Sequence, residues 1–227
     1  SIPHRLIVVC YNGERDREVD ELFGSLNPEY RHYRGTAFDI GTYLTIGRML
    51  DSDFVLCCGS NVHFWKHGWL ELMVEAFQKH GPGAYAPMAS YETSPHLRTC
   101  CIGTTPKLLR EYPHAITTRE ETYMFESGRL CFTRWIQDQK LPALMVMQDG
   151  ELAQSDWRTP PNIFRRGDQS NCIIWDRHTL VYQSESPAAK AHLANMADGG
   201  FIGNSCGSGR ARYKTITVVA VTSLNGP

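Results

Sequence analysis

The sequence predicts an α/β fold in which a mostly parallel central sheet is flanked by helices. Short apolar runs alternate with stretches whose apolar residues recur at helical spacing. Within the first ninety residues the order is strand and helix, a second helix, strand and helix, then strand. At 227 residues and 42% hydrophobic composition, the chain can also build one sizeable core. We therefore expect one main domain.

The first half of the chain contains the segments that predict the parallel core. Apolar runs bounded by turn residues indicate strands, and apolar residues three or four positions apart indicate helices. The expected elements are strands at residues 5–11, 53–58 and 83–90, and helices at residues 16–26, 41–50 and 69–80. The strand at 53–58 is apolar enough to lie buried in the middle of the sheet.

The predicted helices and strands alternate less regularly in the second half of the chain. Thr118 and Glu121 have the spacing of a capping box at a helix start. The proline-interrupted residues 155–169 predict a loop over a surface or a site. Further elements are expected as strands at residues 96–103 and 141–148 and helices at residues 105–112 and 129–139. Residues 187–227 predict a helix, a glycine-rich tail and a lone strand that starts a further domain.

Composition excludes several classes of partner. The chain carries 23 basic and 24 acidic residues, a formal net charge of -1, which gives no bulk attraction to nucleic acid or to an anionic membrane.

The eight cysteines lie mostly in apolar runs and predict reduced core residues. We see neither a secretion signal nor an 18-residue apolar run, so we expect a cytoplasmic protein that meets membranes only through other domains or partners.

One stretch resembles a known enzyme family. Residues 34–61, RGTAFDIGTYLTIGRMLDSDFVLCCGSN, resemble the nucleotide-binding stretch of GT-A glycosyltransferases. FDIGTY, GWLELMVEAF, FTRWIQDQKLPAL and RRGDQSN are similar to a bacterial polysaccharide-synthesis branch of that family. The resemblance implies a GT-A-like, Rossmann-type sandwich over residues 1–186. It also implies transfer of a sugar from a nucleotide-sugar donor to a hydroxyl of a polysaccharide or glycolipid acceptor.

The chain departs from the family at its metal motif. Most GT-A enzymes have Asp-x-Asp there to hold a divalent cation, and this chain has Gly59, Ser60 and Asn61. Hard cations prefer sites with carboxylate ligands, so we expect no metal or other cofactor and a metal-independent or impaired site. The His63 and His67 pair has no accompanying metal motif.

Donor binding is expected at the end of the central strand. Ligands of open α/β sheets bind beyond the carboxyl ends of strands, which places Gly59, Ser60 and Asn61 at a site; the alternative is a tight turn. Without a metal, cationic groups must neutralise the donor diphosphate. The candidates for this role are Arg165, Arg166 and His178.

Two further segments are donor-binding candidates. Asp39 precedes a helix and is expected to accept hydrogen bonds from a base or ribose; the alternative is a helix cap. Tyr11 and Asn12 follow the first strand, where Tyr11 can stack on the base or pack against the sheet.

Catalysis and acceptor binding are assigned to later residues. The resemblance implies that Glu126 is the base that deprotonates the acceptor hydroxyl; its rivals are Glu120, Glu121 and Asp138, and the alternative is a solvated helix face. The predicted loop at residues 155–169 supplies the candidates for binding the acceptor. The alternative roles for these residues are to anchor the loop or to cap a helix. These candidates are Trp157, Arg158, Asp168 and Gln169.

Two other function classes compete with the transferase. A non-catalytic module of a larger polymer-assembly protein would bind nucleotide sugar or glycan without turnover. A nucleotidyltransferase would share the α/β sandwich, but its glycine-rich basic loop is missing after the first strand, where Gly13 is followed by Glu14.

Overall fold

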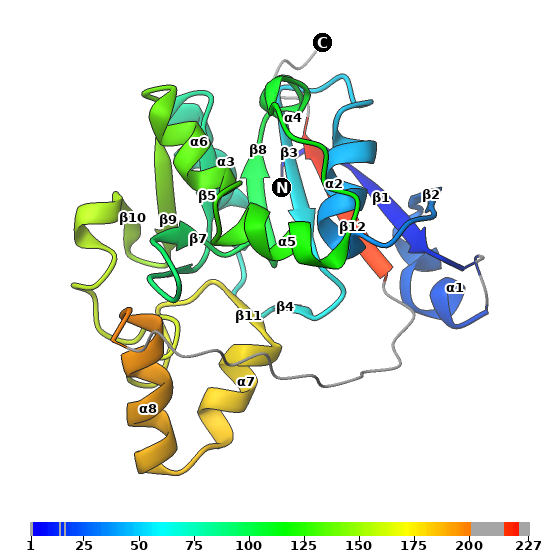
Figure 1. Ribbon diagram of the computed structural model, residues 1–227. Helices are drawn as coiled ribbons and strands as arrows, with labels where there is room; N and C mark the ends of the chain where they lie inside the picture. The colour runs from blue at the N-terminus through cyan, green and yellow to red at the C-terminus, as the bar shows by residue number, and fades with distance from the viewer. Residues whose placement is uncertain (1, 14, 16, 201–215, 223–227) are drawn as a thin grey trace.

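A computed structural model describes residues 2–13, 15, 17–200 and 216–222 of the chain. It shows a mixed α/β protein whose main sheet has eight strands in the order β10-β9-β5-β8-β3-β12-β1-β2 (Figure 1). The strands are β1 (His4–Tyr11), β2 (Glu29–Tyr33), β3 (Phe54–Cys58), β5 (Ala84–Ala86), β8 (Cys101–Thr104), β9 (Ala143–Met147), β10 (Gly150–Leu152) and β12 (Ile216–Thr222). Two small sheets pair β4 (Val62–Phe64) with β11 (Ile174–Asp176) and β6 (Ala89–Ser90) with β7 (His96–Leu97).

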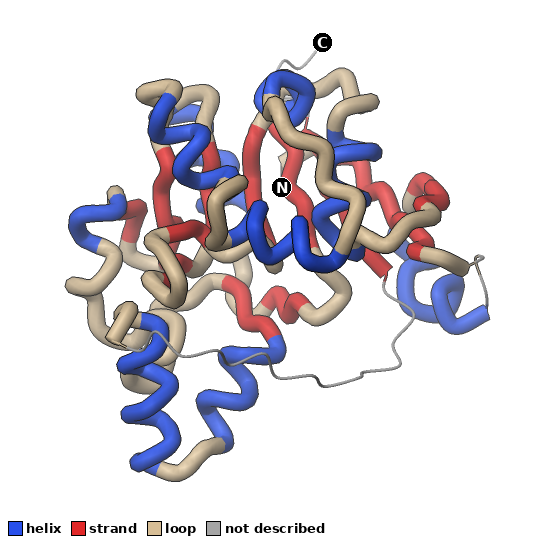
Figure 2. Tube along the Cα trace, in the orientation of Figure 1, coloured by secondary structure: helices blue, strands red, loops and turns tan. Residues whose placement is uncertain are grey.

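Helices cover both faces of the main sheet, and the strands form one layer between them (Figure 2). The helices are α1 (Arg17–Phe23), α2 (Phe38–Gly47), α3 (Trp69–His80), α4 (Pro106–Glu111), α5 (Arg119–Glu126), α6 (Phe132–Asp138), α7 (Arg177–Ser184) and α8 (Pro187–Ala197), with 3-10 turns at Gly24–Leu26 and Gln154–Asp156. In the described part of the chain, none of these helices has the length and apolar character needed to cross a bilayer.

The expectation of a mostly parallel sheet is wrong. Only the pairs β1–β2 and β5–β9 are parallel, and the other five adjacent pairs are antiparallel. The reason is that β8, β10 and β12 are inserted in the reverse direction between or beside strands that share one direction. A parallel neighbour needs a long crossover, whereas β5 reaches β8 through the short β6–β7 hairpin without a helix.

Five strands nevertheless point the same way. The pairings give one common direction to β1, β2, β3, β5 and β9, so their carboxyl ends lie at the same edge of the sheet. β3 lies inside the sheet, between β12 and β8, and all five of its side chains are buried. The prediction for this strand is confirmed.

The final strand is placed differently from the expectation. β12 lies inside the main sheet between β1 and β3, antiparallel to both, rather than at the start of a further domain. The glycine-rich run before it, and Cys206 within that run, lie outside the described residues. The seven described cysteines are free thiols, six of them buried.

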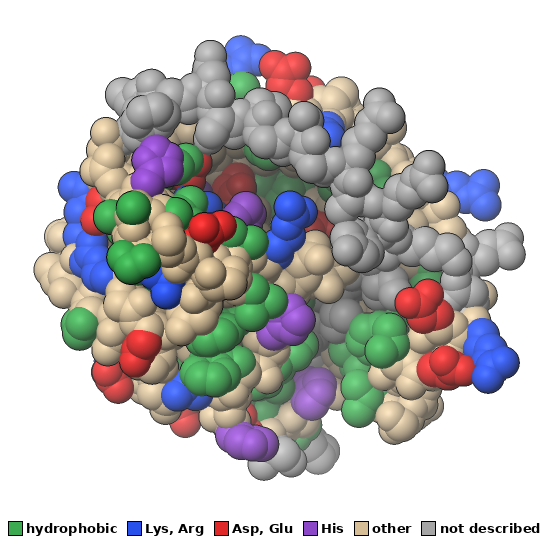
Figure 3. Space-filling view, turned by 90° about the horizontal axis from the view of Figure 1, so that it is seen from below, with side chains coloured by type: hydrophobic (Ala, Val, Ile, Leu, Met, Phe, Trp, Pro, Cys, Tyr) green, Lys and Arg blue, Asp and Glu red, His purple; other side chains and the backbone are tan. Residues whose placement is uncertain are grey.

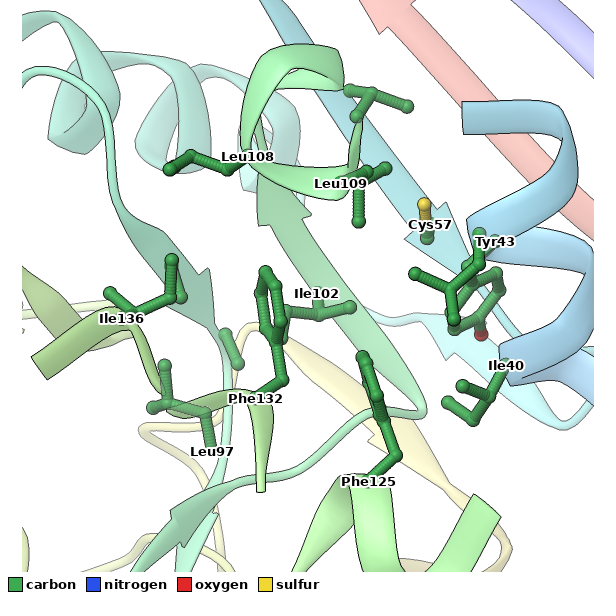
Figure 4. Close-up of a cluster of buried hydrophobic side chains, with 14 of the residues drawn as sticks. Ile40, Tyr43, Cys57, Leu97, Ile102, Leu108, Leu109, Phe125, Phe132 and Ile136 are labelled. Carbon is green, nitrogen blue, oxygen red and sulfur yellow. The ribbon is translucent and has the colours of Figure 1, made fainter. Parts of the chain in front are cut away.

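The two faces of β3 contact different cores because its side chains alternate. Val55 and Cys57 face the larger core under α2, α5 and α6, and Phe54 packs with α3 on the other face. In the larger core, Phe125 of α5 stacks on Phe132 of α6 with 5.2 Å between ring centroids (Figure 4). The buried Phe125 fixes the last turn of α5, which ends at the next residue.

Helix ends follow their local signals. The predicted capping box of Thr118 and Glu121 is present at the start of α5. Gly81 ends α3 with a positive φ of 78°, and the loop predicted at residues 155–169 contains only the end of a 3-10 turn. These signals are local in the sequence, which is why they could be identified without tertiary information.

A glycine in the reversed strand β8 provides a test of the sheet packing. A Cβ on Gly103 would overlap the ring of Phe54, so Gly103→Ala is expected to lower the free energy of unfolding by about 1–3 kcal/mol. Gly24→Ala is the matched control, because no atom lies within 4 Å of its Cβ position. Urea denaturation measures both; equal stability of the two variants would contradict this packing.

Candidate functional site

A pocket of about 250 Å³ lies beyond the end of β3, at the edge of the sheet where the five parallel-running strands end. It brings together five predicted residues from four separate segments: Asp39, Gly59, Asn61, Glu126 and His178. In Figure 3, acidic, basic and histidine side chains meet in a hollow on this side of the molecule. Small-molecule sites usually measure about 300–1,000 Å³, so this pocket has room for part of a larger ligand.

Asp39 and Gly59 meet at the floor of the pocket. Asp39 lies in the first turn of α2, and a Cβ on Gly59 would approach its Oδ2 to 2.7 Å. The Gly59 N–H donates to the Cys100 carbonyl at 2.8 Å, which joins the turn after β3 to the segment before β8. Asp39 is not the N-cap of α2, since Ala37 holds that position. The absent side chain of Gly59 is therefore what lets the carboxylate approach the end of β3.

Arg98 is the main cation of the pocket, and sequence reasoning missed it. Its side chain is buried and donates from Nη2 to Asp176 Oδ2 at 3.1 Å, while its guanidinium lies 4.5 Å from the ring centroid of Phe164. Among the described residues, its Nε has no hydrogen-bond partner. Burying an unsatisfied donor of a charged group costs free energy, and the pair with Asp176 compensates the charge of Arg98 but not this donor.

Asp176 has two roles at once. Its Oδ1 accepts a hydrogen bond from the Thr179 N–H at 2.9 Å and so caps α7, while its Oδ2 binds Arg98. Burial raises the pKa of Asp176, but the charge of Arg98 and these hydrogen bonds outweigh burial and leave its pKa below the ordinary value. Burial lowers the pKa of Arg98, and the opposing charge of Asp176 raises it above the ordinary value. The pair therefore stays charged.

Glu126 is the last residue of α5 and lines the same pocket. Its Oε1 accepts a hydrogen bond from the Thr99 backbone N–H at 3.1 Å. Burial raises the pKa of Glu126, but the charges of Arg98 and His96 and the bond from Thr99 bring its pKa below the ordinary value. The carboxylate is ionised at neutral pH and can accept a proton, which is the state that a general base needs.

The rival acids for this role lie elsewhere. Glu121 accepts hydrogen bonds from the backbone of Thr117 and Thr118 and so belongs to the helix cap. Glu120 and Asp138 are not among the pocket-lining residues. Of the four acidic candidates, Glu126 is the one that lines the pocket.

His178 lines the pocket, and Arg165 lies behind it. Arg165 Nη2 and His178 Nδ1 are 3.5 Å apart, and Arg165 also pairs with Glu92 Oε2 at 3.1 Å. Burial, and then the charge of Arg98, lower the pKa of His178 below its ordinary value. His178 is therefore neutral at pH 7 and acts as a hydrogen-bonding group, while Arg165 supplies charge from outside the lining.

Tyr11 and Asn12 lie beside the pocket but do not line it. The Tyr11 hydroxyl donates to the Gly35 carbonyl at 2.7 Å, and Asn12 exchanges two hydrogen bonds with the Gly35 backbone. Tyr11 stacks on Phe38, a pocket-lining residue, with 5.8 Å between centroids. Ser60 is exposed in the turn between two lining residues.

Three of the predicted residues form a separate structural group away from the lining. Arg166 binds both Oδ atoms of Asp198 at 2.8 Å, and Arg158 donates to the Asp198 carbonyl at 2.8 Å. Trp157 is only 2% exposed and donates from its indole to the Leu152 carbonyl at 2.9 Å. The Trp157 ring is therefore a buried loop anchor in this structure and offers no surface for stacking on a sugar.

The polar run after this loop is mainly structural. Gln169 is fully buried; its Oε1 accepts from the Arg165 N–H and its Nε2 donates to the Thr179 carbonyl. Asp168 is exposed and accepts from the Ser170 N–H at 2.9 Å. Gln169 holds the loop against α7, whereas Asp168 is open to a ligand.

Ten lining residues were not predicted from the sequence: Phe38, Ile40, Val62, Arg98, Thr99, Cys100, Thr122, Tyr123, Asp176 and Arg177. A signal for Arg98 existed, because a charged residue within the apolar run HLRTCCIG needs a buried partner. Arg177 had no such signal, since it follows the helix cap and its nearness to the pocket depends on how β11 pairs with β4.

The residues present do not form a protein cage for a divalent cation. In the described part of the chain, no group of three or more His, Cys, Asp or Glu side chains has a geometry that could hold a metal. The Asp176 carboxylate is already bound by Arg98, and Glu126 by the Thr99 N–H. Metal independence stays a prediction.

The buried ion pair can be tested through stability. Asp176→Ala is expected to lower the free energy of unfolding by about 3–5 kcal/mol, because it leaves the buried charge of Arg98 uncompensated and removes a helix cap. Asp198→Ala is the matched control: it breaks the more exposed pair with Arg166 and should cost about 1 kcal/mol or less. Chemical denaturation at pH 7 measures both variants, and similar losses would contradict the structure.

The same pair predicts a pH dependence. The pKa of Asp176 is lower in the folded protein, so its contribution to stability is complete above the ordinary pKa of about 3.9 and is lost as pH falls through the folded value. The stability gap between the natural protein and Asp176→Asn should therefore narrow below about pH 4. A gap that stays constant down to pH 3 would contradict the assignment.

Three comparisons bear on the identity of the site. Searches of protein-family models, of curated proteins and of solved structures found no match to this chain. The function is therefore inferred from the geometry of the pocket and from the residues that line it.

Proposed function

We propose that the protein is a glycosyltransferase that moves a sugar from a nucleotide-sugar donor to a hydroxyl of a glycan or glycolipid. The observation that carries this proposal is the pairing of a buried cation with an ionised carboxylate in one pocket. Arg98 and Glu126 both line the pocket, and Glu126 accepts a hydrogen bond from the backbone N–H of Thr99, the residue after Arg98. Such a pocket suits a reaction that needs both an anion-stabilising group and a base.

The pocket residues can divide the work of transfer. As the bond between the donor sugar and the diphosphate breaks, negative charge grows on the leaving oxygen, and Arg98 and Arg177 supply donors and positive charge for it. Glu126 takes the proton of the acceptor hydroxyl as that oxygen attacks the sugar. Asp39 and Asn61 offer polar groups to the sugar or ribose hydroxyls.

Supporting evidence for a GT-A-like arrangement comes from the edge of the sheet. Residues after β3 and at the start of α2 lie together at the common carboxyl edge, as nucleotide sites in α/β sheets require. A cytoplasmic location is part of the proposal, and the seven free cysteines fit a reducing compartment.

A non-catalytic binding module is the second candidate, because the cations in and behind the pocket are strongly engaged. Arg98 is held by Asp176, and Arg165 by Glu92. Binding of nucleotide sugars, measured by thermal shift, together with product formation separates the candidates. A module would bind without releasing nucleoside diphosphate or transferring sugar.

Replacing the main pocket cation tests the anion-stabilising role. Arg98→Lys keeps the charge but loses the planar fork, so transfer from a panel of UDP-, GDP- and dTDP-sugars should slow by roughly one to three orders of magnitude. Arg166→Ala, which removes a cation outside the lining, is the control and should retain near-natural rates. The opposite ranking would show that Arg166, and not Arg98, meets the diphosphate.

Chelation tests the role of metal. Because Gly59, Ser60 and Asn61 stand at the Asp-x-Asp position, transfer is expected to continue in excess EDTA at a rate similar to that with added Mn²⁺. Loss of transfer in EDTA and its recovery with Mn²⁺ would contradict metal independence while leaving the transferase proposal intact.

The pH profile of transfer tests the base. Because the pKa of Glu126 is lowered, its carboxylate stays ionised to a lower pH than an ordinary glutamate does. We therefore expect kcat to fall only below about pH 4. Glu126→Gln should slow transfer by about 10²–10⁴-fold and abolish the fall of kcat at low pH. Glu121→Gln, on the same helix, is the control and should keep both the natural rate and the fall of kcat at low pH. An unchanged Glu126→Gln profile would remove Glu126 from catalysis.

A further inference from the structure

A short two-stranded ribbon runs away from the pocket. β4 and β11 pair antiparallel with His63 opposite Trp175 and Phe64 opposite Ile174. Successive side chains of a strand point to opposite faces, so His63, Trp65 and Trp175 share one face of the ribbon. Phe64 belongs to the other face, where it stacks on Trp69 with 4.2 Å between ring centroids.

The face that carries Trp65 begins at the pocket. Asn61 and Val62 at the start of β4, and Asp176 and Arg177 at the end of β11, all line the pocket, so the ribbon begins there. The four residue steps from Asn61 to Trp65 span about 13 Å at the usual rise of a strand. A chain-like ligand whose end lies in the pocket would therefore cross His63 and Trp175 and reach Trp65. We call this face the ribbon track, made of Asn61, His63, Trp65, Trp175 and Arg177.

Trp65 is held in place although it is exposed. Its side chain stacks on Trp175 with 4.4 Å between ring centroids and an interplanar angle of 24°. Its indole Nε1 donates to the Cys172 carbonyl at 2.8 Å. The residue is nonetheless 45% exposed. An aromatic ring with this fixed orientation loses little conformational freedom when a ligand binds to it.

Polar side chains border the aromatic pair. His63 is exposed, and the Lys66 ammonium lies 4.9 Å from the Trp65 ring centroid. The Trp175 indole donates to the carbonyl of Gln169 at 3.4 Å, which places the neighbouring Asp168 close to this end of the track. The flexible Lys66 side chain can move off the ring and donate to a hydroxyl.

We propose that the ribbon track binds the acceptor glycan and delivers its terminal hydroxyl to Glu126. This inference rests on the proposed function and names the acceptor side of the same site. A sugar ring presents an apolar face edged by hydroxyls, which matches indole faces edged by His63, Lys66 and Asp168. The track replaces the buried Trp157 as the aromatic platform and retains Asp168 as a polar contact.

A glycan fits this surface better than a protein or a membrane does. Stable protein interfaces bury about 800 Å² on each partner around an apolar centre, and lipid-binding surfaces present broad apolar faces. Here one stacked indole pair stands among polar groups. Figure 3 shows hydrophobic and histidine side chains side by side next to the hollow.

Affinity electrophoresis of the full chain tests the track. Native gels each contain one soluble glycan: dextran, glycogen, galactomannan, xyloglucan, alginate or hyaluronan. At least one gel should retard the natural protein, and Trp65→Ala should weaken that interaction by roughly tenfold. Trp65→Phe should recover part of it, because phenylalanine keeps a ring but loses the bond to the Cys172 carbonyl. Thermal melting checks that each variant folds.

Phe64→Ala is the matched control. Phe64 is the adjacent residue, 46% exposed against 45% for Trp65, and lies on the opposite face of the ribbon. The Phe64→Ala variant should be retarded by the glycan as strongly as the natural protein is. Equal losses from Phe64→Ala and Trp65→Ala, or no retardation by any glycan of the panel, would overturn the proposal. Two other outcomes would also overturn the proposal. Sedimentation with phosphatidylglycerol vesicles that is lost in Trp65→Ala would assign the surface to lipid, and self-association that is lost in Trp65→Ala would assign it to a second copy of the chain.

A parallel measurement separates this inference from the proposed function. Thermal shift with the nucleotide-sugar panel should give the same stabilisation for Trp65→Ala and the natural protein, because the donor pocket is intact. Donor turnover without Trp65-dependent glycan binding overturns the track alone. Trp65-dependent glycan binding without donor binding or turnover overturns the transferase and leaves a glycan-binding surface.

Discussion

The site depends on the buried ion pair of Arg98 and Asp176. Arg98 lies in the segment before β8, and Asp176 ends β11 and caps α7, so the pair joins the main sheet to the ribbon and to its helix. The neighbouring Thr99 N–H holds Glu126 at the end of α5. Because a buried charge that loses its partner is strongly unfavourable, this pair fixes how the pocket and the ribbon track meet.

The charges of the pocket explain how it can bind an anion without attracting one from a distance. Its lining contains Arg98 and Arg177 against Asp39, Glu126 and Asp176, so the lining carries no excess of positive charge. In the proposed function, affinity for a diphosphate comes from directed donors at short range, supplied by the guanidinium groups of Arg98 and Arg177. Such a site favours a ligand that offers acceptor oxygens in the right positions over any anion of the same charge.

Local patterns predicted the elements well, and long-range pairing limited the rest. The buried β3, the helices on both faces and the capping box of α5 follow from periodicity and caps. The direction of β8 and the place of β12 depend on strand pairing, which periodicity does not encode. Asn61 was predicted because its strand ends at the edge of the sheet, Asp39 because it precedes a helix, and Glu126 only through the family resemblance. Trp157 was misjudged, because the burial of a loop indole is decided by tertiary packing.

The ribbon links the two halves of the proposed reaction. Alternation in β4 sends Val62 and Phe64 towards the core side and leaves Asn61, His63 and Trp65 on the track. A shift of one residue in the pairing of β4 with β11 would exchange these faces and turn Trp65 away from the pocket. The cap and ion pair of Asp176, which is paired with Val62, oppose such a shift. The interaction that orders the pocket therefore also sets the direction from which the proposed acceptor chain would enter it.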